Sequence, residues 1–170
     1  SNLQAALRTV VTTGDAAPGT AETFGFFESA PVLNAGGEVA FLGSLDDLDG
    51  TMGIWSEGTG IGSLRKVALM GEAAPDAGGA TFEFFTGVPQ LNGRDVAFQA
   101  TLDDNREGIF TDREQPTNAL TKVALEGEPA PGAASGGNFQ FLTLRTFGQM
   151  HSGTAFRAGV SGQPNTPAIY

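Results

Sequence analysis

Two acidic turns hold the residues with the clearest chemical potential in this sequence. Each turn gathers carboxylate and amide oxygens within a few residues and has a glycine at or directly after its end. Calcium prefers several oxygen ligands from one tight loop, which makes these residues candidate calcium ligands. No glutamate stands at the spacing that closes an EF-hand, and a solvated hairpin turn is the competing interpretation. The candidate ligands are Asp46, Asp47, Asp49, Asp103, Asn105 and Glu107.

Residues for nucleophilic or acid–base catalysis are sparse. His151 is the only histidine, so any Ser-His-Asp arrangement would have to use it, and no Gly-x-Ser-x-Gly elbow supplies a matching serine. Glycoside hydrolysis needs two carboxyl groups facing each other across a cleft. In Asp46-Asp47 and Asp103-Asp104 the adjacent side chains tend to point to opposite faces of a strand. The sequence therefore favours a non-enzymatic protein, with a carbohydrate-active enzyme that uses the Asp-rich turns as the alternative.

Nucleotide and metal fingerprints do not occur in the chain: there is no P-loop, dinucleotide fingerprint or HExxH motif. The glycine-rich stretch 58–62 lies between two predicted strands. It therefore lacks the helix N-terminus whose amides hold phosphate, and we expect a hairpin loop there. No cofactor is expected other than calcium.

Composition limits the possible partners. The chain has 170 residues, no cysteine and a net charge of −10. An acidic surface repels nucleic acid and anionic membranes, and without cysteine there is neither a disulfide framework nor a thiolate metal site. We expect no nucleic-acid partner and no membrane insertion, since no apolar run approaches the length that spans a bilayer.

The sequence offers little information on compartment. No basic segment followed by an apolar segment marks a signal peptide at the start of the given sequence. The chain contains only two lysines, Lys66 and Lys122, and is rich in Gly, Ala and Thr. These features favour an extracellular or cell-surface location for what would then be the mature part of a secreted protein.

A sequence unit of about 57 residues occurs three times in the chain. Residues 65–75 (RKVALMGEAAP) and 121–131 (TKVALEGEPAP) are identical at eight of eleven positions, and residues 14–18 (GDAAP) begin the same series. We predict a single repeat domain over residues 1–170, with units at about 1–63, 64–119 and 120–170. The repeated acid, which is Asp15, Glu72 or Glu128, predicts a turn or a contact with Lys66 or Lys122.

Each unit is predicted to contain four short strands, and we expect almost no helix because no window shows sustained helical periodicity. Alternating residues, Asn-Gly or Gly-rich turns and Asp-rich turns define the segments. The predicted first strands are 7–12, 64–69 and 120–125; the second are 23–29, 81–87 and 138–144; the third are 38–45, 95–102 and 153–160; the fourth are 53–56, 108–111 and 167–170.

The aromatic residues fall into repeated columns. Eleven of the 13 phenylalanines occupy four columns, and Phe110 shares a fifth with the only Trp and the only Tyr, Trp55 and Tyr170. Each unit must bury the same face, so we predict that these columns form the core. The F-x-F pattern of the second strand predicts two rings on one face. With its aromatics placed in the core, the chain would have few rings left for sugar stacking.

The turn and strand that contain Asn34, Gly37, Ala40 and Phe41 resemble the bacterial tandem-repeat family named after NxxGxxAF, whose members carry varied cell-surface anchors. The later Gly-Ile-aromatic strands resemble blades of TolB-type propellers. The second unit keeps Ala97 and Phe98, while the third keeps only Ala155-Phe156 of the motif. The resemblance implies an all-β fold of three propeller-like blades; a β-trefoil or a three-sheet prism are the alternatives. It implies no activity.

Three blades are too few to close a propeller, which has four or more. We therefore expect self-association, either as two chains that close six blades or as a filament that grows end to end. A glycan or a surface protein is a further possible partner. The expected function is a structural or ligand-binding module. Hydrolysis lost in Asp46→Asn and Asp103→Asn variants would indicate the enzyme instead.

Overall fold

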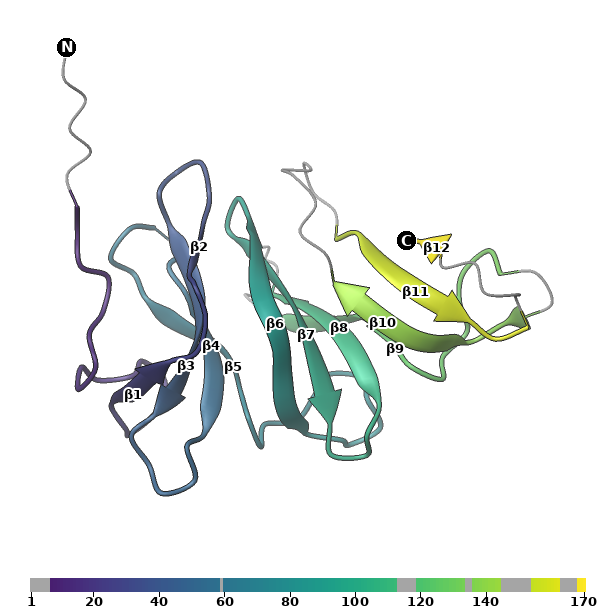
Figure 1. Ribbon diagram of the computed structural model, residues 1–170, viewed down its shortest axis with the longest axis horizontal. Coiled ribbons are helices and arrows are strands. Elements are labelled where there is room, and N and C mark those ends of the chain that lie inside the picture. The colour runs from purple at the N-terminus through teal and green to yellow at the C-terminus, as the bar shows by residue number, and fades with distance from the viewer. Residues whose placement is uncertain (1–6, 59, 113–118, 134–135, 145–153, 163–167) are drawn as a thin grey trace, which may run out of the picture.

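The structure is a computed structural model that describes residues 7–58, 60–112, 119–133, 136–144, 154–162 and 168–170. These residues form three separate antiparallel sheets and no α-helix, which confirms the all-β prediction. The sheets follow one another along the molecule, and residues 7–12 and β12 lie at opposite ends of it (Figure 1). In the described part of the chain they do not close into a ring (Figure 1).

Each sheet is built from antiparallel strands that lie close to one another in the sequence. Sheet 1 contains β1 (Phe24–Phe27), β2 (Val32–Leu33), β3 (Val39–Leu45), β4 (Met52–Ser56) and β5 (Arg65–Leu69). Sheet 2 contains β6 (Phe82–Asn92), β7 (Asp95–Leu102), β8 (Glu107–Asp112) and β9 (Leu120–Leu125). Sheet 3 contains β10 (Phe139–Leu144), β11 (Phe156–Val160) and β12 (Ala168–Ile169).

Most predicted strands are present, but the first one is not. Residues 7–12 form no strand, although their sequence corresponds to β5 and β9. The reason is pairing: β5 is hydrogen-bonded to β4 and β9 to β8, so each belongs to the sheet formed by the preceding residues. No sheet of the described chain precedes residues 7–12, and a strand without a neighbour has no ladder to join. Sheets and sequence units are thus offset by one strand.

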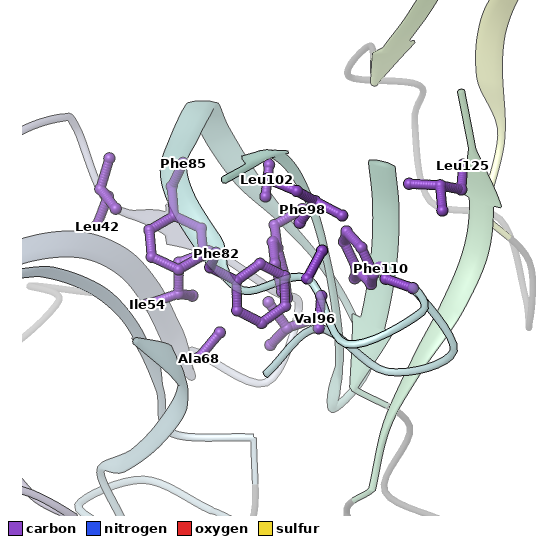
Figure 2. Packing of buried hydrophobic residues seen from close by; sticks show 14 of the residues in the cluster. Leu42, Ile54, Ala68, Phe82, Phe85, Val96, Phe98, Leu102, Phe110 and Leu125 are labelled. Atoms are coloured by element: carbon purple, nitrogen blue, oxygen red, sulfur yellow. The ribbon is translucent and has the colours of Figure 1, made fainter. Parts of the chain in front are cut away.

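The sheets stack because each has two unlike faces. An aliphatic face of sheet 1, which includes Leu42 and Ile54, packs on the phenyl rings of sheet 2, among them Phe82, in one buried cluster (Figure 2). Sheet 2 repeats the arrangement, since its Ile109 is buried in a cluster with Phe139 of sheet 3. We call each contact between neighbouring sheets a joint. In both joints the earlier sheet contributes aliphatic side chains and the later sheet contributes aromatic rings.

A polar contact also ties sheet 2 to sheet 3. The buried Gln99 side chain donates a hydrogen bond from Nε2 to the carbonyl oxygen of Leu142 at 3.0 Å and accepts one on Oε1 from the Leu144 amide at 3.0 Å. The side-chain nitrogen and oxygen of Gln99 therefore each have a hydrogen-bond partner, as a buried polar group requires. Gln99 fixes the position of β10 against β7 in addition to the apolar contacts.

A bulge in the first strand of each sheet changes which rings are buried. The register shifts between Phe24 and Phe26 in β1 and between Phe82 and Phe84 in β6. As a result Phe24 packs on Phe27, with ring centroids 5.6 Å apart, while Phe26 faces outward. The predicted pairing of the two F-x-F rings on one face is therefore wrong, because an extra residue in a bulge shifts the alternation of side chains.

Substituting Gly53 by alanine is expected to lower the free energy of unfolding by about 1–3 kcal/mol, the usual cost of overpacking a core. A Cβ on Gly53 would lie 2.6 Å from the ring of Trp55, which is fully buried and cannot move aside. Gly36→Ala is the matched control, because its added methyl group would meet the ends of the flexible Glu38 and Asn34 side chains, which can move aside. Urea unfolding of the two variants checks this; equal losses would contradict it.

Candidate functional site

The first acidic turn joins β3 to β4 and uses its carboxylates within the turn. Asp47 accepts a hydrogen bond on Oδ1 from the Thr51 amide at 2.8 Å. Hydrogen bonds from the Thr51 side chain and amide hold the pKa of Asp47 below its ordinary value. This is the contact expected of an aspartate at the start of a tight turn.

The second acidic turn joins β7 to β8 and differs in its partners. Asp103 accepts hydrogen bonds from Thr81, on Oδ1 from its amide at 3.1 Å and on Oδ2 from its hydroxyl at 3.0 Å. Asp104 accepts from Nε of Arg106 at 2.7 Å, and this hydrogen bond lowers its pKa. Asn105 takes a left-handed backbone conformation with φ 67°. Each of the two carboxylates thus already has a local partner.

The six calcium candidates do not converge on one point. Asp46, Asp47 and Asp49 lie in the turn of sheet 1 and the other three in or beside the turn of sheet 2. Glu107 accepts the Leu142 amide on Oε2 at 3.3 Å and so reaches sheet 3. Among the described residues, no three His, Asp or Glu side chains are grouped closely enough to hold a metal ion. Calcium binding stays a prediction, and His151 lies outside the described residues.

The repeated acid of the Gly-acid-x-Ala-Pro turn contacts lysine where a lysine is present. Lys66 forms an ion pair with Glu72, and Lys122 forms one with Glu128, which confirms the predicted contacts. In the first copy Thr9 stands in the lysine position, and Asp15 accepts from the Thr12 amide at 2.8 Å instead. The turn glycines Gly71 and Gly127 have φ values of 82° and 84°, a conformation that glycine adopts without strain. Each of the three acids thus has a partner within or beside its turn.

A charged seam, formed by the pairs Arg8–Glu57 and Arg65–Asp112, was not anticipated from the sequence. Arg8 binds both carboxylate oxygens of Glu57, whose side chain is only 1% exposed. Burial acts to raise the pKa of Glu57, but hydrogen bonds from Arg8 and the Gly62 amide outweigh it and the pKa is lowered. This pair joins residues 7–12 to the end of β4.

The second pair of the charged seam joins two sheets. Arg65 of β5 in sheet 1 lies against Asp112 at the end of β8 in sheet 2, and the Asp112 side chain is 2% exposed. Burial raises the pKa of Asp112 above its ordinary value, and the Arg65 charge offsets only part of this. Arg8 and Arg65 are equivalent in the sequence repeat, as are Glu57 and Asp112. That recurrence was the available sequence signal, and it favours a structural role over catalysis.

The Arg8→Gln variant is expected to unfold at a lower temperature than the wild type at neutral pH, and the gap should close in acid. Glu57 has a lowered pKa when folded, so its contribution is present above the ordinary Glu pKa of about 4.3 and disappears as the pH falls through the folded value. Thermal unfolding between pH 3 and pH 7 measures this. Lys66→Gln, which breaks a more exposed pair, is the control. A gap that does not change with pH would exclude the assignment.

One phenyl ring per sheet faces solvent. Phe26, Phe84 and Phe141 are 61%, 53% and 42% exposed, and each lies in the first strand of its sheet. The prediction that the aromatic columns are all buried is wrong for this column, because the bulges turn these rings outward. The three rings recur at equivalent positions of the three sheets and are available for contact with a ligand or partner.

Comparison with known proteins gives one match. A family model described as "Family of unknown function (DUF7453)" matches residues 1–168. No curated protein and no solved structure matches. Among the described residues there is no helix of the length and apolarity needed to cross a membrane.

Proposed function

The chain belongs to the DUF7453 family, a family of unknown function, and we propose that it is a non-enzymatic structural module that assembles end to end with further copies of itself. The observation that carries the proposal is the one-directional stacking of its sheets. Aliphatic side chains of one sheet meet aromatic rings of the next at both internal joints. A joint of this kind is heterologous, and such contacts generate rings or filaments rather than twofold dimers.

The exposed surface of sheet 3 supports this proposal. Ile54 and Ile109 occupy equivalent positions in β4 and β8 and are 1% and 0% exposed, because each is buried in the joint with the next sheet. The equivalent Ile169 in β12 is 72% exposed. The aliphatic side of a joint is thus presented to solvent at one end of the molecule.

The finer architecture belongs to the same proposal. Sheet 2 has four antiparallel strands in the order β6-β7-β8-β9, and sheet 1 has the equivalent order β1-β3-β4-β5 with the short β2 paired to β3. Both orders are compatible with propeller-like blades. The resemblance to NxxGxxAF repeats, whose family members carry cell-surface anchors, supports an extracellular or cell-surface location. Protease treatment of intact cells that produce the protein tests this location, since a surface protein is digested and an internal one is not.

Sedimentation velocity over a series of micromolar concentrations tests the assembly. We expect the average mass to rise with concentration, and electron microscopy of the same samples to show rings or fibres. Ile169→Asp should reduce this assembly, because it places a charge on the surface that is to be buried. Leu48→Asp is the control, since Leu48 is fully exposed in the turn between β3 and β4. A monomeric mass at every concentration would overturn the proposal.

The outward phenyl rings favour a second candidate function, the binding of a glycan or surface protein. Rings exposed on the first strand of each sheet offer stacking surfaces at regular intervals along the molecule. A triple variant with serine at 26, 84 and 141 should lose retention on a glycan array or on immobilised cell-surface proteins. A wild-type protein that retains nothing, or a variant that binds equally, would exclude this role.

A further inference from the structure

Residues 7–12 contact sheet 1 as β5 contacts sheet 2, but they pair with no strand of the described chain. Three parallel observations show this, and each compares the start of the chain with the segments that contain β5 and β9. The comparison concerns the turn that follows each segment, the charged seam and the apolar contacts.

The turn that follows residues 7–12 docks in the same way as its two counterparts. The amides of Gly14, Gly71 and Gly127 each donate to the carbonyl oxygen of the first phenylalanine of the next strand, at 2.8 Å in all three cases. Isolated bridges at Ala16, Ala73 and Pro129 repeat the match. Residues 13–17 are therefore placed on β1 as residues 70–74 are placed on β6.

The charged seam shows that residues 7–12 themselves also correspond to β5. Arg65 of β5 reaches Asp112 in the following sheet, and Arg8 reaches Glu57, the equivalent residue one sheet earlier. Val10 and Val11 are half-buried against the aromatic cluster of sheet 1 that includes Phe24 and Trp55. Residues 7–12 thus contact sheet 1 as β5 contacts sheet 2, but their backbone has no strand beside it in the described chain.

Sheet 3 shows the opposite deficiency. Sheets 1 and 2 each continue from β4 to β5 and from β8 to β9, whereas in the described part of the chain nothing pairs with the outer edge of β12. Tyr170 exchanges both backbone hydrogen bonds with Phe156 of β11, at 3.0 Å each. Because the direction of these groups alternates along a strand, the amide and carbonyl of Ile169 point to the open edge.

From this complementarity we infer that residues 7–12 of a second copy pair antiparallel with β12 and complete sheet 3. The inference rests on the proposed end-to-end assembly and specifies its joint. The register follows from the internal joints: Ile54 is opposite Ala68 and Ile109 is opposite Ala124. The equivalent pair is Ile169 of one copy and Val11 of the other. Sheet 1 of the second copy then covers Ile169, as sheet 2 covers Ile54.

The molecule cannot make this pairing with itself, because β12 and residues 7–12 lie at opposite ends of it (Figure 1). A second copy carries the matching segment, in the register that the internal joints define. The net charge of −10 on each copy predicts that the joint is weaker at low salt, where the copies repel each other more strongly.

Cross-linking with single cysteines tests the register, since the protein has no cysteine of its own. One preparation carries Val11→Cys, the other carries Ile169→Cys, and the two are mixed under mild oxidation. Residues opposite each other across a hydrogen-bonded pair have Cα atoms about 5.5 Å apart, a separation that a disulfide spans. We expect a disulfide-linked heterodimer. Val10→Cys with Ile169→Cys is the matched control and should give far less product, because neighbouring side chains point to opposite faces.

A backbone variant provides the second measurement. Ile169→Pro removes the amide that donates across the open edge, so we expect end-to-end association to weaken by about tenfold or more. Ile169→Val keeps the amide and an aliphatic side chain and should associate like the wild type. Sedimentation velocity reports both, and circular dichroism checks that the variants are folded.

The outcomes separate this inference from the proposed function. Association that persists in Ile169→Pro, without the 11–169 cross-link, overturns the strand pairing and leaves end-to-end assembly standing. A monomer at all concentrations with no cross-link overturns both. The 11–169 cross-link in a protein that otherwise sediments as a monomer supports the pairing and overturns stable assembly.

Discussion

Replacing Phe82 by alanine is expected to lower the free energy of unfolding by about 3–5 kcal/mol, the range observed when a large buried aromatic residue is truncated. Phe82 is 1% exposed and is surrounded by three rings of sheet 2, with centroid distances of 5.6 Å to Phe85, 5.8 Å to Phe98 and 5.0 Å to Phe110. It also belongs to the cluster that includes Ile54 of sheet 1 (Figure 2). Its loss would leave a cavity where two sheets meet.

Phe84→Ala is the control for this prediction. It removes the same side chain from the same strand, two residues away, but Phe84 is 53% exposed. We expect a change within about 0.5 kcal/mol, as for most surface substitutions. Urea unfolding followed by the fluorescence of Trp55, the only tryptophan, measures both variants. Similar losses in the two variants would mean that the bulge in β6 does not set the orientation of these rings.

The Arg65→Met variant is expected to lose about 3–5 kcal/mol of stability at neutral pH, because it leaves the buried Asp112 carboxylate without its cation. The double variant Arg65→Met/Asp112→Leu should recover most of this loss, since apolar residues of similar volume often replace a buried ion pair without cost. Urea unfolding of the four proteins in this cycle gives the coupling between the two residues. A double variant as unstable as Arg65→Met would show that Arg65 acts through packing instead.

The stability loss of Arg65→Met should also shrink in acid, as for Arg8→Gln, although the pKa of its acidic partner is shifted in the opposite direction. Burial raises the pKa of Asp112 in the folded protein, and removing Arg65 raises it further. A raised pKa contributes stability below the ordinary Asp value of about 3.9 that is lost as the pH rises through the folded value. Arg65→Met should therefore lie nearest to the wild type in acid and diverge from it as the pH increases.

The sequence predicts local structure well where the pairing partner is close in the chain. The strands Asp95–Leu102 and Leu120–Leu125 were predicted with the bounds that the structure shows. Turn chemistry accounts for this success, because Asn-Gly and Gly-acid-x-Ala-Pro fix where a strand ends. Residues 7–12 have the same pattern and form no strand, since strand formation depends on a neighbour that local sequence does not reveal.

Side-chain orientation and long-range charge pairing were harder to predict. The bulges at Phe24–Phe26 and Phe82–Phe84 shift the alternation by one residue. The first ring of each FxFF pattern is therefore buried, the last ring packs against it, and the middle ring is exposed. The Arg65–Asp112 pair joins residues 47 positions apart on different sheets, and only the equivalence of Arg8 with Arg65 hinted at it. A cluster of acidic residues in the sequence does not show whether the carboxylates are free to bind a metal ion, and the candidate ligands Asp47 and Asp103 already accept hydrogen bonds from Thr51 and Thr81.

The bulges in β1, β6 and β10 also bear on sideways aggregation of the sheets. Each bulge lies in the first strand of its sheet, where no further strand of the described chain is paired on the outer side. A sheet edge that is irregular and strongly twisted pairs poorly with a strand of another molecule. Natural sheets use such bulged edges to avoid edge-to-edge aggregation. Growth through β12 would then give thin, unbranched particles, because lateral bundling is discouraged along that flank of the molecule.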